Sequence, residues 1–208
     1  METQYLTPQD SDYPASLVDC PYITSPDRLT VSGNIDLLQR PLFALFCSVK
    51  CPGDLILKTY DFARNLCVAG VSTIGGFHSP MEKECLTLLL RGQQPIISCP
   101  ARGIENMRPP VAWRQSLQTG RLLVISPFKA HQNRPTEKMA TQRNHLVVAL
   151  ASETFVAYAE PNGKTAYFCQ QILDLGKPLL TFDALANQPL IDLGAQPIQP
   201  DYNSFILS

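Results

Sequence analysis

The sequence has 208 residues, of which 45% are hydrophobic, and a formal net charge of −1. These values fit a globular domain large enough to bury a core, and they exclude a fibrous or largely disordered chain. No apolar run approaches the roughly 20 residues that cross a bilayer, and the N-terminus lacks the basic and apolar regions of a signal peptide. We therefore expect a cytoplasmic protein without a membrane partner.

The cysteines indicate a reducing environment. They are odd in number and most lie in apolar runs: Cys20, Cys47, Cys51, Cys67, Cys85, Cys99 and Cys169. This pattern is typical of small core residues that stay as free thiols. None has the spacing of a zinc site, and Cys47 and Cys51 have no histidine pair nearby. The sequence therefore predicts neither a metal nor a cofactor.

Charge is distributed unevenly along the chain. Between Arg91 and Arg143 there are nine basic residues against two acidic ones, a charge of +7. The rest of the chain has 8 basic and 16 acidic residues, a charge of −8. Such asymmetry suggests one face built for polyanions on an otherwise acidic body. A solvated basic surface without a partner is the alternative.

Residues 1–40 contain short strand-like pieces separated by proline and aspartate. We interpret them as a small N-terminal cap or arm on the main domain. A disordered tail is the competing interpretation, but it would expose apolar side chains, among them Leu17, Val31, Tyr22 and Ile23.

From residue 41 the chain alternates short apolar runs with amphipathic segments. We expect strands over residues 41–47, 66–73, 94–98, 122–126, 154–158 and 177–182. We expect helices over residues 54–65, 79–90, 111–118 and 164–175, and another helix that opens near Arg143. Residues 184–208 show no helix pattern, so we interpret them as a tail packed on the 41–183 domain.

Strands that alternate with helices predict an α/β fold, here a Rossmann-like parallel sheet with helices on both faces. Binding sites in such sheets form at the carboxyl ends of the strands. That rule gathers residues 48–53, 75–78, 100–108, 128–134 and 161–164 on one rim, within reach of Arg143 and Asn144.

One of these loops has the chemistry of an anion site. The turn at residues 160–163 is followed by Lys164 and Thr165, which can open a helix. Main-chain N–H groups at a helix start attract an anion, and Lys164 adds charge. Arg143 can bring a guanidinium to the same phosphate. An ordinary loop and a surface arginine are the alternative.

These loops together resemble the DprA/Smf family of DNA-processing proteins, whose extended Rossmann fold belongs to the SLOG group of nucleotide and nucleic-acid binders. The similarity covers about Tyr13 to Asp183, beginning with residues 13–17 and 29–38, which resemble the family's lead-in to its first strand. Residues 45–48 stand at the family's Gly-Ser-Arg loop, 75–78 at its Gly-Ile-Asp loop, 142–145 at its Arg-Asn-Arg helix and 162–165 at its Ser-Gly-Ser turn.

The sequence also departs from the family pattern. At the first loop Cys47 replaces glycine and Val49 replaces arginine, so only Ser48 matches, with Lys50 as a substitute cation. At the second loop His78 replaces aspartate and Glu82 replaces histidine. An acid and an imidazole four residues apart on one helix face can hydrogen-bond, and we expect a structural pair there. The family's winged-helix domain has no room in this length, so we expect a short form without it.

The resemblance implies a protein that binds single-stranded DNA in a positive pocket and hands it to a RecA-type recombinase. The phosphate-binding candidates are Ser48, Lys50, Gly75, Gly76, His78, Arg143, Asn144, Gly163, Lys164 and Thr165. We favour binding over catalysis and assign no catalytic residue. A SLOG-type nucleotide sensor or nucleotide-processing enzyme is the alternative, and a scaffold that has lost its ligand is a third. A homodimer is left open.

Overall fold

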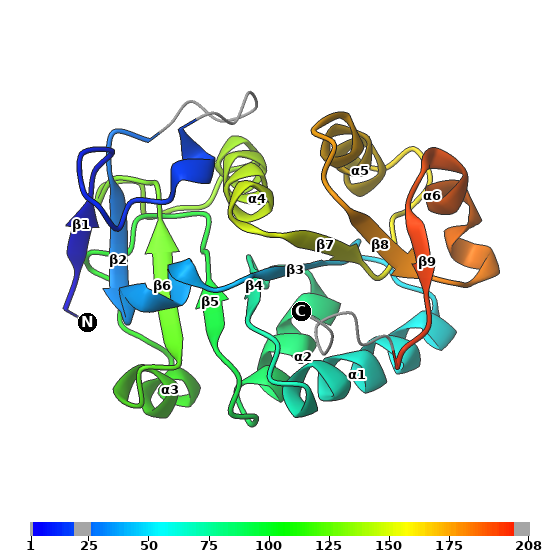
Figure 1. The fold of residues 1–208 in the computed structure, drawn as a ribbon, viewed down its shortest axis with the longest axis horizontal. Coiled ribbons are helices and arrows are strands. Elements are labelled where there is room, and N and C mark those ends of the chain that lie inside the picture. Colours follow the sequence, from blue (N-terminus) through cyan, green and yellow to red (C-terminus); the bar gives the residue numbers. More distant parts are fainter. Residues whose placement is uncertain (1, 19–25, 202–208) are drawn as a thin grey trace.

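The computed structural model describes residues 2–18 and 26–201. Its centre is one sheet with the strand order β1-β2-β6-β5-β4-β3-β7-β8-β9 (Figure 1). Strands β3 to β9 run parallel, whereas β2 is antiparallel to β6 and β1 is antiparallel to β2. The strands are β1 (Gln4–Leu6), β2 (Leu29–Gly33), β3 (Phe43–Phe46), β4 (Thr73–Gly75), β5 (Ile96–Ser98), β6 (Leu122–Ser126), β7 (Glu153–Val156), β8 (Leu179–Phe182) and β9 (Gln196–Ile198).

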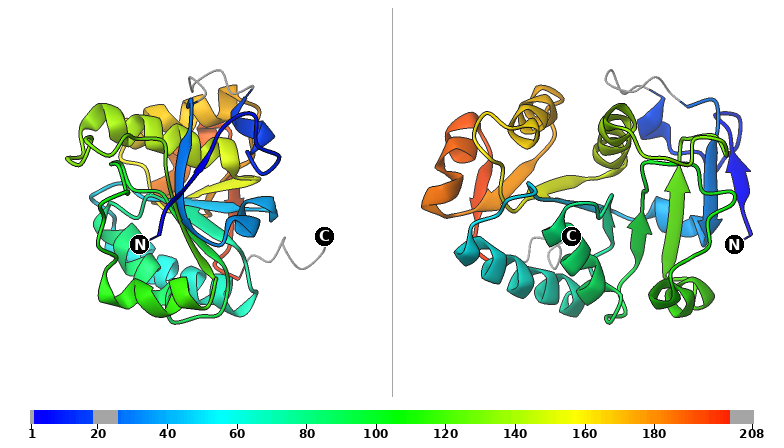
Figure 2. Two further views of the ribbon diagram at one scale, coloured as in Figure 1. Left: turned by 90° about the vertical axis from the view of Figure 1, so that its left-hand side faces the viewer. Right: turned by 180° about the vertical axis from the view of Figure 1, so that it is seen from behind.

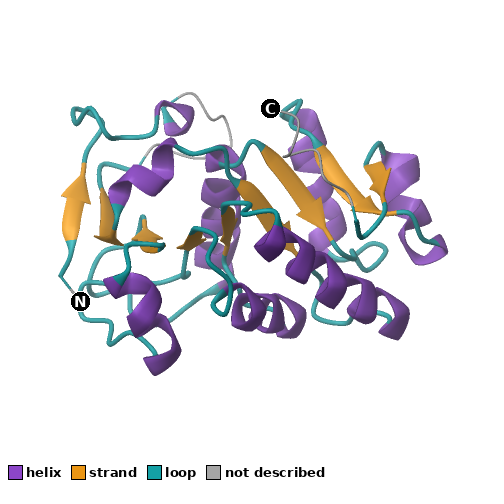
Figure 3. Cartoon of the chain, turned by 60° about the horizontal axis from the view of Figure 1, so that its bottom comes forward, coloured by secondary structure: helices purple, strands orange, loops and turns teal. Residues whose placement is uncertain are grey.

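Helices cover both faces of the sheet (Figures 1 and 2). They are α1 (Gly53–Val68), α2 (Pro80–Leu89), α3 (Arg114–Gln118), α4 (Glu137–Leu150), α5 (Lys164–Asp174) and α6 (Gln188–Leu193). Short 3-10 turns span Ala15–Leu17, Ile35–Gln39, Val111–Trp113 and Leu185–Asn187. In Figure 1, α1, α2 and α3 lie on one side of the sheet and α4, α5 and α6 on the other, and Figure 3 shows the strands between these layers. The predicted Rossmann-like α/β class is therefore confirmed.

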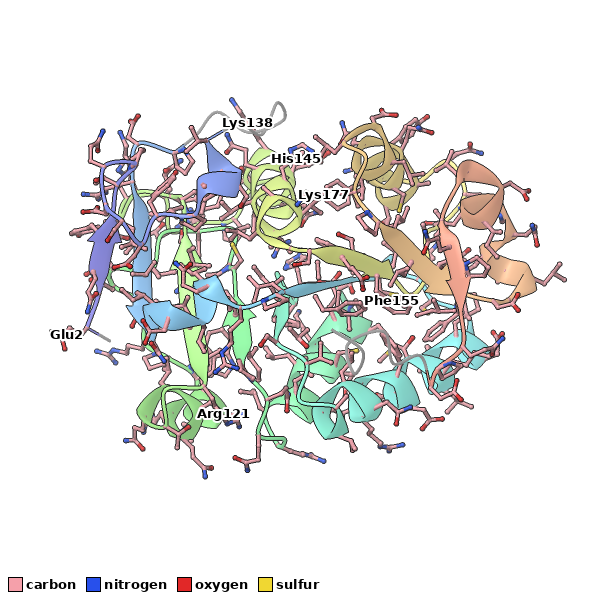
Figure 4. All side chains as sticks on the ribbon, viewed as in Figure 1. Glu2, Arg121, Lys138, His145, Phe155 and Lys177 are labelled. Atoms are coloured by element: carbon pink, nitrogen blue, oxygen red, sulfur yellow. The ribbon has the colours of Figure 1, made fainter. Side chains whose placement is uncertain are left out.

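The core has two halves, one on each face of the sheet. Successive side chains of a strand point to opposite faces, so Phe43 and Leu45 of β3 pack in the cluster with α1 and α2, and Ala44 and Phe46 pack in the cluster with α4 and α5. Phe155 of β7 lies between the sheet and α1 (Figure 4), with its ring centroid 4.5 Å from that of Phe62. A strand covered on both faces is apolar throughout, which is why residues 41–47 were recognisable as one.

Local capping sets where two helices begin. Ser79 accepts a hydrogen bond from the N–H of Glu82 at 3.3 Å, and Pro80 follows as the first helical residue of α2, as predicted. Thr136 accepts from the N–H of Met139 at 3.2 Å and caps α4. Helix α4 therefore begins well before Arg143, and the expectation that it opens near that residue is wrong.

Two further boundaries differ from prediction. Residues 66–73 are not one strand, because α1 runs to Val68 and β4 begins only at Thr73. Gly70, with a φ of 71°, ends the helix, and the N–H of Val71 donates to the carbonyl of Leu66 at 3.0 Å. After residue 183 the expected absence of helix is wrong, since α6 and the edge strand β9 follow.

The N-terminal segment adds β1 and β2 to the sheet as antiparallel strands. Leu17, Leu29 and Val31 are completely buried, which argues against a disordered tail over the described part of this segment. Cys20, Tyr22 and Ile23 lie outside the described residues. Across residues 2–18 and 26–201, none of the helices combines the length and apolarity that crossing a bilayer requires.

Candidate functional site

The order in which successive strands are added to the sheet reverses between β3 and β7. Successive crossovers lead from β3 to β6 on one side and from β7 to β9 on the other, so the loops after β3 and β7 diverge from a common point. Ser48 sits at this point and is buried. Its N–H donates to the carbonyl of Tyr158 at 2.9 Å, and its Oγ accepts from the N–H of Glu160 at 3.0 Å. Ser48 therefore fastens the two loops together.

The loops after β3 and β4 are joined by the carboxylate of Glu82. One oxygen, Oε1, accepts from the N–H of Cys47 at 3.1 Å, and Oε2 accepts from the N–H of His78 at 2.8 Å. Glu82 is buried, whereas His78 is exposed. The expected contact with the imidazole is thus replaced by one with the main chain, because α2 begins at Pro80 and the two side chains do not share a helix face.

Arg143 is buried, with only 4% of its surface exposed. Its Nη1 donates to the carbonyl of Cys99 at 3.1 Å, and its Nε donates to Oδ1 of Asn144 at 2.8 Å. The guanidinium lies against Gly76, where an added Cβ would be 1.4 Å from Nη1. Arg143 therefore links the ends of β4 and β5 to α4, and Gly76 leaves the space for it.

Helix α4 is also anchored away from the rim (Figure 4). A ring nitrogen of His145 lies 3.0 Å from Oε1 of Gln171 on α5. At the C-terminal end of α4, the ammonium of Lys177 donates to the carbonyls of Val148, Ala149 and Ala151 at 2.7, 3.0 and 2.8 Å. These contacts fix the helix that carries Arg143.

The turn before α5 has the predicted form. Asn162 takes a left-handed conformation with a φ of 59°, and the N–H of Gly163 donates to the carbonyl of Glu160 at 2.9 Å. Lys164 opens α5, and its Nζ lies 2.7 Å from Oε1 of Glu137, the first residue of α4. Both side chains are exposed. Lys164 therefore contacts the first residue of α4, whereas Arg143, farther along the same helix, is directed toward Gly76 and the carbonyl of Cys99.

The remaining predicted residues lie around these contacts. Lys50 is exposed on the loop between β3 and α1, and Thr165 is half-buried in the first turn of α5. Gly75 ends β4, and an added Cβ there would meet the ring of Phe77 at 3.1 Å. The fold thus brings the predicted loops to the carboxyl ends of the parallel strands. The side chains of Arg143 and Ser48 point inward there.

Two adjoining hollows lie over the segments that follow β5 and β6, and neither is lined by any of the ten predicted binding residues. One, of about 510 Å³, is lined by His131, Gln132, Asn133, Arg134, Thr136, Lys138, Met139 and Gln142. The other, of about 340 Å³, is lined by Arg102, Gly103, Asn106, Met107, Ala130, Asn133 and Arg134. They share Asn133 and Arg134 and together form the paired hollows.

The segments that form the paired hollows are held together by hydrogen bonds. The N–H of Gly103 donates to the carbonyl of Gln132 at 2.8 Å, and Ser126 Oγ donates to the carbonyl of Arg102 at 2.7 Å. A Cβ added to Gly103 would lie 2.3 Å from the carbonyl oxygen of Lys129. The cations here were visible in the charge count, but selection by motif missed Arg102, Arg134 and Lys138.

The basic segment is divided between two edges of the molecule. Lys138 reaches the outer surface above α4, whereas Arg121 lies near α3 at the opposite edge (Figure 4). Arg121 donates to the carbonyls of Leu89, Gln94 and Leu90, where it caps α2. The expectation that the +7 segment forms a single face is therefore wrong. Within the described ranges, no three His, Cys, Asp or Glu side chains are grouped to hold a metal ion.

The sheet, its covering helices and its loop-built rim define a Rossmann-like α/β protein. By sequence, the chain belongs to the family described as DNA recombination-mediator protein A, which it matches over residues 4–200. The match therefore includes both the N-terminal strands and β9.

Solved structures with the same fold include two DNA processing proteins A. The one from Streptococcus pneumoniae is 18% identical, with a TM-score of 0.78 over 96% of this chain and 72% of that one. The one from Helicobacter pylori is 19% identical, with a TM-score of 0.73 over 94% and 91%. A molybdenum cofactor binding protein from Rippkaea orientalis is 11% identical, with a TM-score of 0.55 over 78% and 91%. No curated protein matches the sequence.

Proposed function

We propose that this protein binds single-stranded DNA along the carboxyl rim of its sheet. The observation that carries the proposal is the pair of hollows over the segments that follow β5 and β6, which Arg102, Arg134 and Lys138 line. Backbone recognition of a single strand needs a cationic groove. The family description and the single-stranded DNA binding reported for the Helicobacter pylori relative support this choice.

The residues would divide the work in this proposal. Exposed cations contact phosphates, and we place Arg134, Lys138, Lys50 and Lys164 in this group. Main-chain groups of the loops at Gly76 and Gly163 approach the bound DNA strand closely. Further contacts come from His78, Asn144 and Thr165, whereas the buried Ser48 and Gly75 keep the loops in shape. Arg143 keeps the loops in place and contributes its charge from beneath.

The test is fluorescence anisotropy with a labelled oligothymidylate over a range of salt concentrations. We expect affinity to fall steeply as salt rises, because each neutralised phosphate releases counterions. Changing Arg134 and Lys138 together to Ala should weaken binding about tenfold and flatten the salt slope by about 1 to 2. Arg91→Ala, an exposed cation after α2 and away from the rim, is the matched control. No binding of the unaltered protein at low salt would refute the proposal.

We also propose that the bound strand is passed to a RecA-type recombinase, since the family is described as recombination mediators. The corresponding measurement is the rate at which such a recombinase loads on DNA coated with a single-strand binding protein, with and without this chain. Unchanged loading would remove this step while leaving DNA binding in place.

A free nucleotide is the second candidate ligand, and the alternative it represents is a SLOG-type sensor. The paired hollows, each of a few hundred Å³, are the right size for one. A panel of mononucleotides in a thermal unfolding assay separates the candidates. Stabilisation by one nucleotide, without a response to oligonucleotides, would favour the sensor.

A further inference from the structure

The basic segment, residues 91–143, contains two acids, and each is paired with a cation from another part of the chain. Oε1 of Glu137 lies 2.7 Å from Nζ of Lys164, and Oε1 of Glu105 lies 3.3 Å from Nη2 of Arg28. The two acids differ in burial, because the side chain of Glu137 is 74% exposed and that of Glu105 only 10%. Water therefore screens the charge of Glu137, whereas the charge of Glu105 has to be balanced by groups of the protein.

Glu105 belongs to the loop that forms the smaller of the paired hollows. The next two residues, Asn106 and Met107, line this hollow, as do Arg102 and Gly103 earlier in the same loop. A poorly solvated negative charge in this loop would repel a phosphate brought to the hollow. The affinity of the hollow for a polyanion therefore depends on what neutralises Glu105.

The start of β2 supplies the neutralising groups. Strand β2 is antiparallel to β6, with Thr30 opposite Ser126, so the first residues of β2 lie at the carboxyl end of β6. A parallel strand in this place would begin at the opposite edge. Arg28 comes directly before β2 and reaches Glu105 from this edge, and Oγ1 of Thr30 donates to the same Oε1 at 3.3 Å. Oε2 of Glu105 is buried and has no hydrogen-bond partner within the described part of the chain.

The edge strand β1 holds Arg28 in turn. The guanidinium carbon of Arg28 lies 4.2 Å from the centroid of the Tyr5 ring, within the distance at which an aromatic face attracts a cation. Tyr5 is the partner of Thr30 in the ladder between β1 and β2. The two N-terminal strands therefore place the guanidinium and the hydroxyl on the same carboxylate oxygen of Glu105.

We propose that Arg28 is a positioning residue for the paired hollows, an assignment that rests on the proposed function of those hollows. Arg28 neutralises Glu105 and holds the loop that carries Arg102 and Asn106, and it acts through Glu105 without contacting the DNA. Strands β1 and β2 thus act on the binding site, although none of their residues lines either hollow.

A double-mutant cycle distinguishes action through Glu105 from direct contact with the DNA. With oligothymidylate at low salt, Arg28→Ala should weaken binding about fivefold to tenfold, whereas Arg28→Lys, which keeps the charge, should lose less than about twofold. In a Glu105→Gln background, Arg28→Ala should change the affinity by less than about twofold, because no charge is left to neutralise. An equal loss in both backgrounds would overturn the proposal, since it would mean direct contact with phosphate. No loss in either background would overturn it as well.

Arg64→Ala is the matched control for removing a paired arginine. Arg64 lies 2.9 Å from Asp61 on α1, in the other helix layer, so its loss should leave the affinity within about 1.5-fold of the starting value. A loss equal to that of Arg28→Ala would overturn the proposal, because net charge alone would then explain both variants.

Hydrogen exchange gives a readout that needs no DNA. The N–H of Gly103 donates to the carbonyl of Gln132, and in Arg28→Ala it should exchange at least about threefold faster, because the loop is held less firmly. The N–H of Ser48, which donates to Tyr158, should exchange at its original rate. If the unaltered protein fails to bind DNA, the proposed function fails, and exchange at Gly103 still decides whether Arg28 holds the loop. Unchanged exchange at Gly103 would overturn that role.

Discussion

The rim has two regions that use polar side chains in opposite ways. Around β3, β4 and β7, the polar groups point inward: Glu82, Arg143 and Ser48 are buried, and each bonds main-chain atoms of a neighbouring loop. Around β5 and β6, Arg134 is exposed on the loop after β6 and Lys138 is exposed in the first turn of α4, and the bond from Gly103 to Gln132 joins the loops after the two strands. Buried motif residues therefore build the shape of the rim, and Arg134 and Lys138, which lie outside the motifs, add exposed positive charge beside it.

This difference teaches that stability and ligand binding should be separable by mutation. A buried charge that satisfies several main-chain groups is costly to remove, because its partners are left unpaired. An exposed cation contributes little to folding but acts on a polyanion at a distance. Variants of the inward region should therefore lose the most stability, and variants of the outward region should change binding more than folding.

The largest loss of stability is expected from Glu82→Ala. The change leaves the N–H groups of Cys47 and His78 without their carboxylate acceptor, which should cost about 3 kcal/mol. Urea unfolding followed by circular dichroism measures this loss. Glu84→Ala, an exposed position two residues along α2, should cost under about 0.5 kcal/mol. Equal losses for both variants would mean that Glu82 does not hold the loops.

Gly76→Ala tests the close approach of Arg143. The new methyl group would occupy the place of the guanidinium, so Arg143 must move and give up its bond to Cys99. We expect a loss of about 1 to 3 kcal/mol. Gly53→Ala has open space around the added Cβ and should change stability by no more than about 0.5 kcal/mol. If Gly76→Ala left the stability unchanged, the position of Arg143 beside Gly76 would not be important for folding.

Much of the fold could be predicted because its signals are local. The apolar run at residues 122–126 and the Ser79-Pro80 start of α2 depend on neighbours in the sequence, and both were correct. The prediction of a strand over residues 66–73 was wrong because this apolar run contains both the end of a helix and the residues that lead into a strand. Helix α6 was missed because it is short and contains Pro189, although proline is acceptable at a helix start.

The candidate site was predictable only in part, for a physical reason. Arg143 is far from Gly76 in sequence, and only the folded sheet shows that one leaves room for the other. An arginine is normally expected in solvent, so its inward orientation had no signal of its own. Arg134 and Lys138 did have a signal in the sequence, namely the excess of positive charge. Charge alone does not tell which residues of a basic segment lie on the same side of the folded protein.

An intermediate effect is expected from Thr136→Ala at the start of α4. The hydroxyl accepts from the N–H of Met139, and losing this cap should cost about 1 kcal/mol. Thr141→Ala makes the same chemical change at an exposed site inside the helix, where it should be neutral or stabilising by a few tenths of a kcal/mol. Thermal unfolding of both proteins measures the difference. A loss from Thr141→Ala as large as that from Thr136→Ala would rule out capping as the cause.

The smallest effect is expected from Glu137→Gln, and it should be visible in binding rather than folding. Glu137 pairs with Lys164 at 2.7 Å, and both side chains are exposed, so the stability should change by less than about 0.5 kcal/mol. Neutralising the acid frees the charge of Lys164 at the rim, so affinity for oligothymidylate should rise about twofold to threefold at low salt and return to the starting value at high salt.

Asp61→Asn provides the matched control for that change. Asp61 pairs with Arg64 at 2.9 Å on α1, and this pair is similarly exposed but belongs to a helix of the other layer. If Glu137→Gln tightens binding and Asp61→Asn does not, the gain comes from the position of the freed cation. If both variants gain equally, net charge alone is responsible, and Lys164 has no particular place in the DNA path.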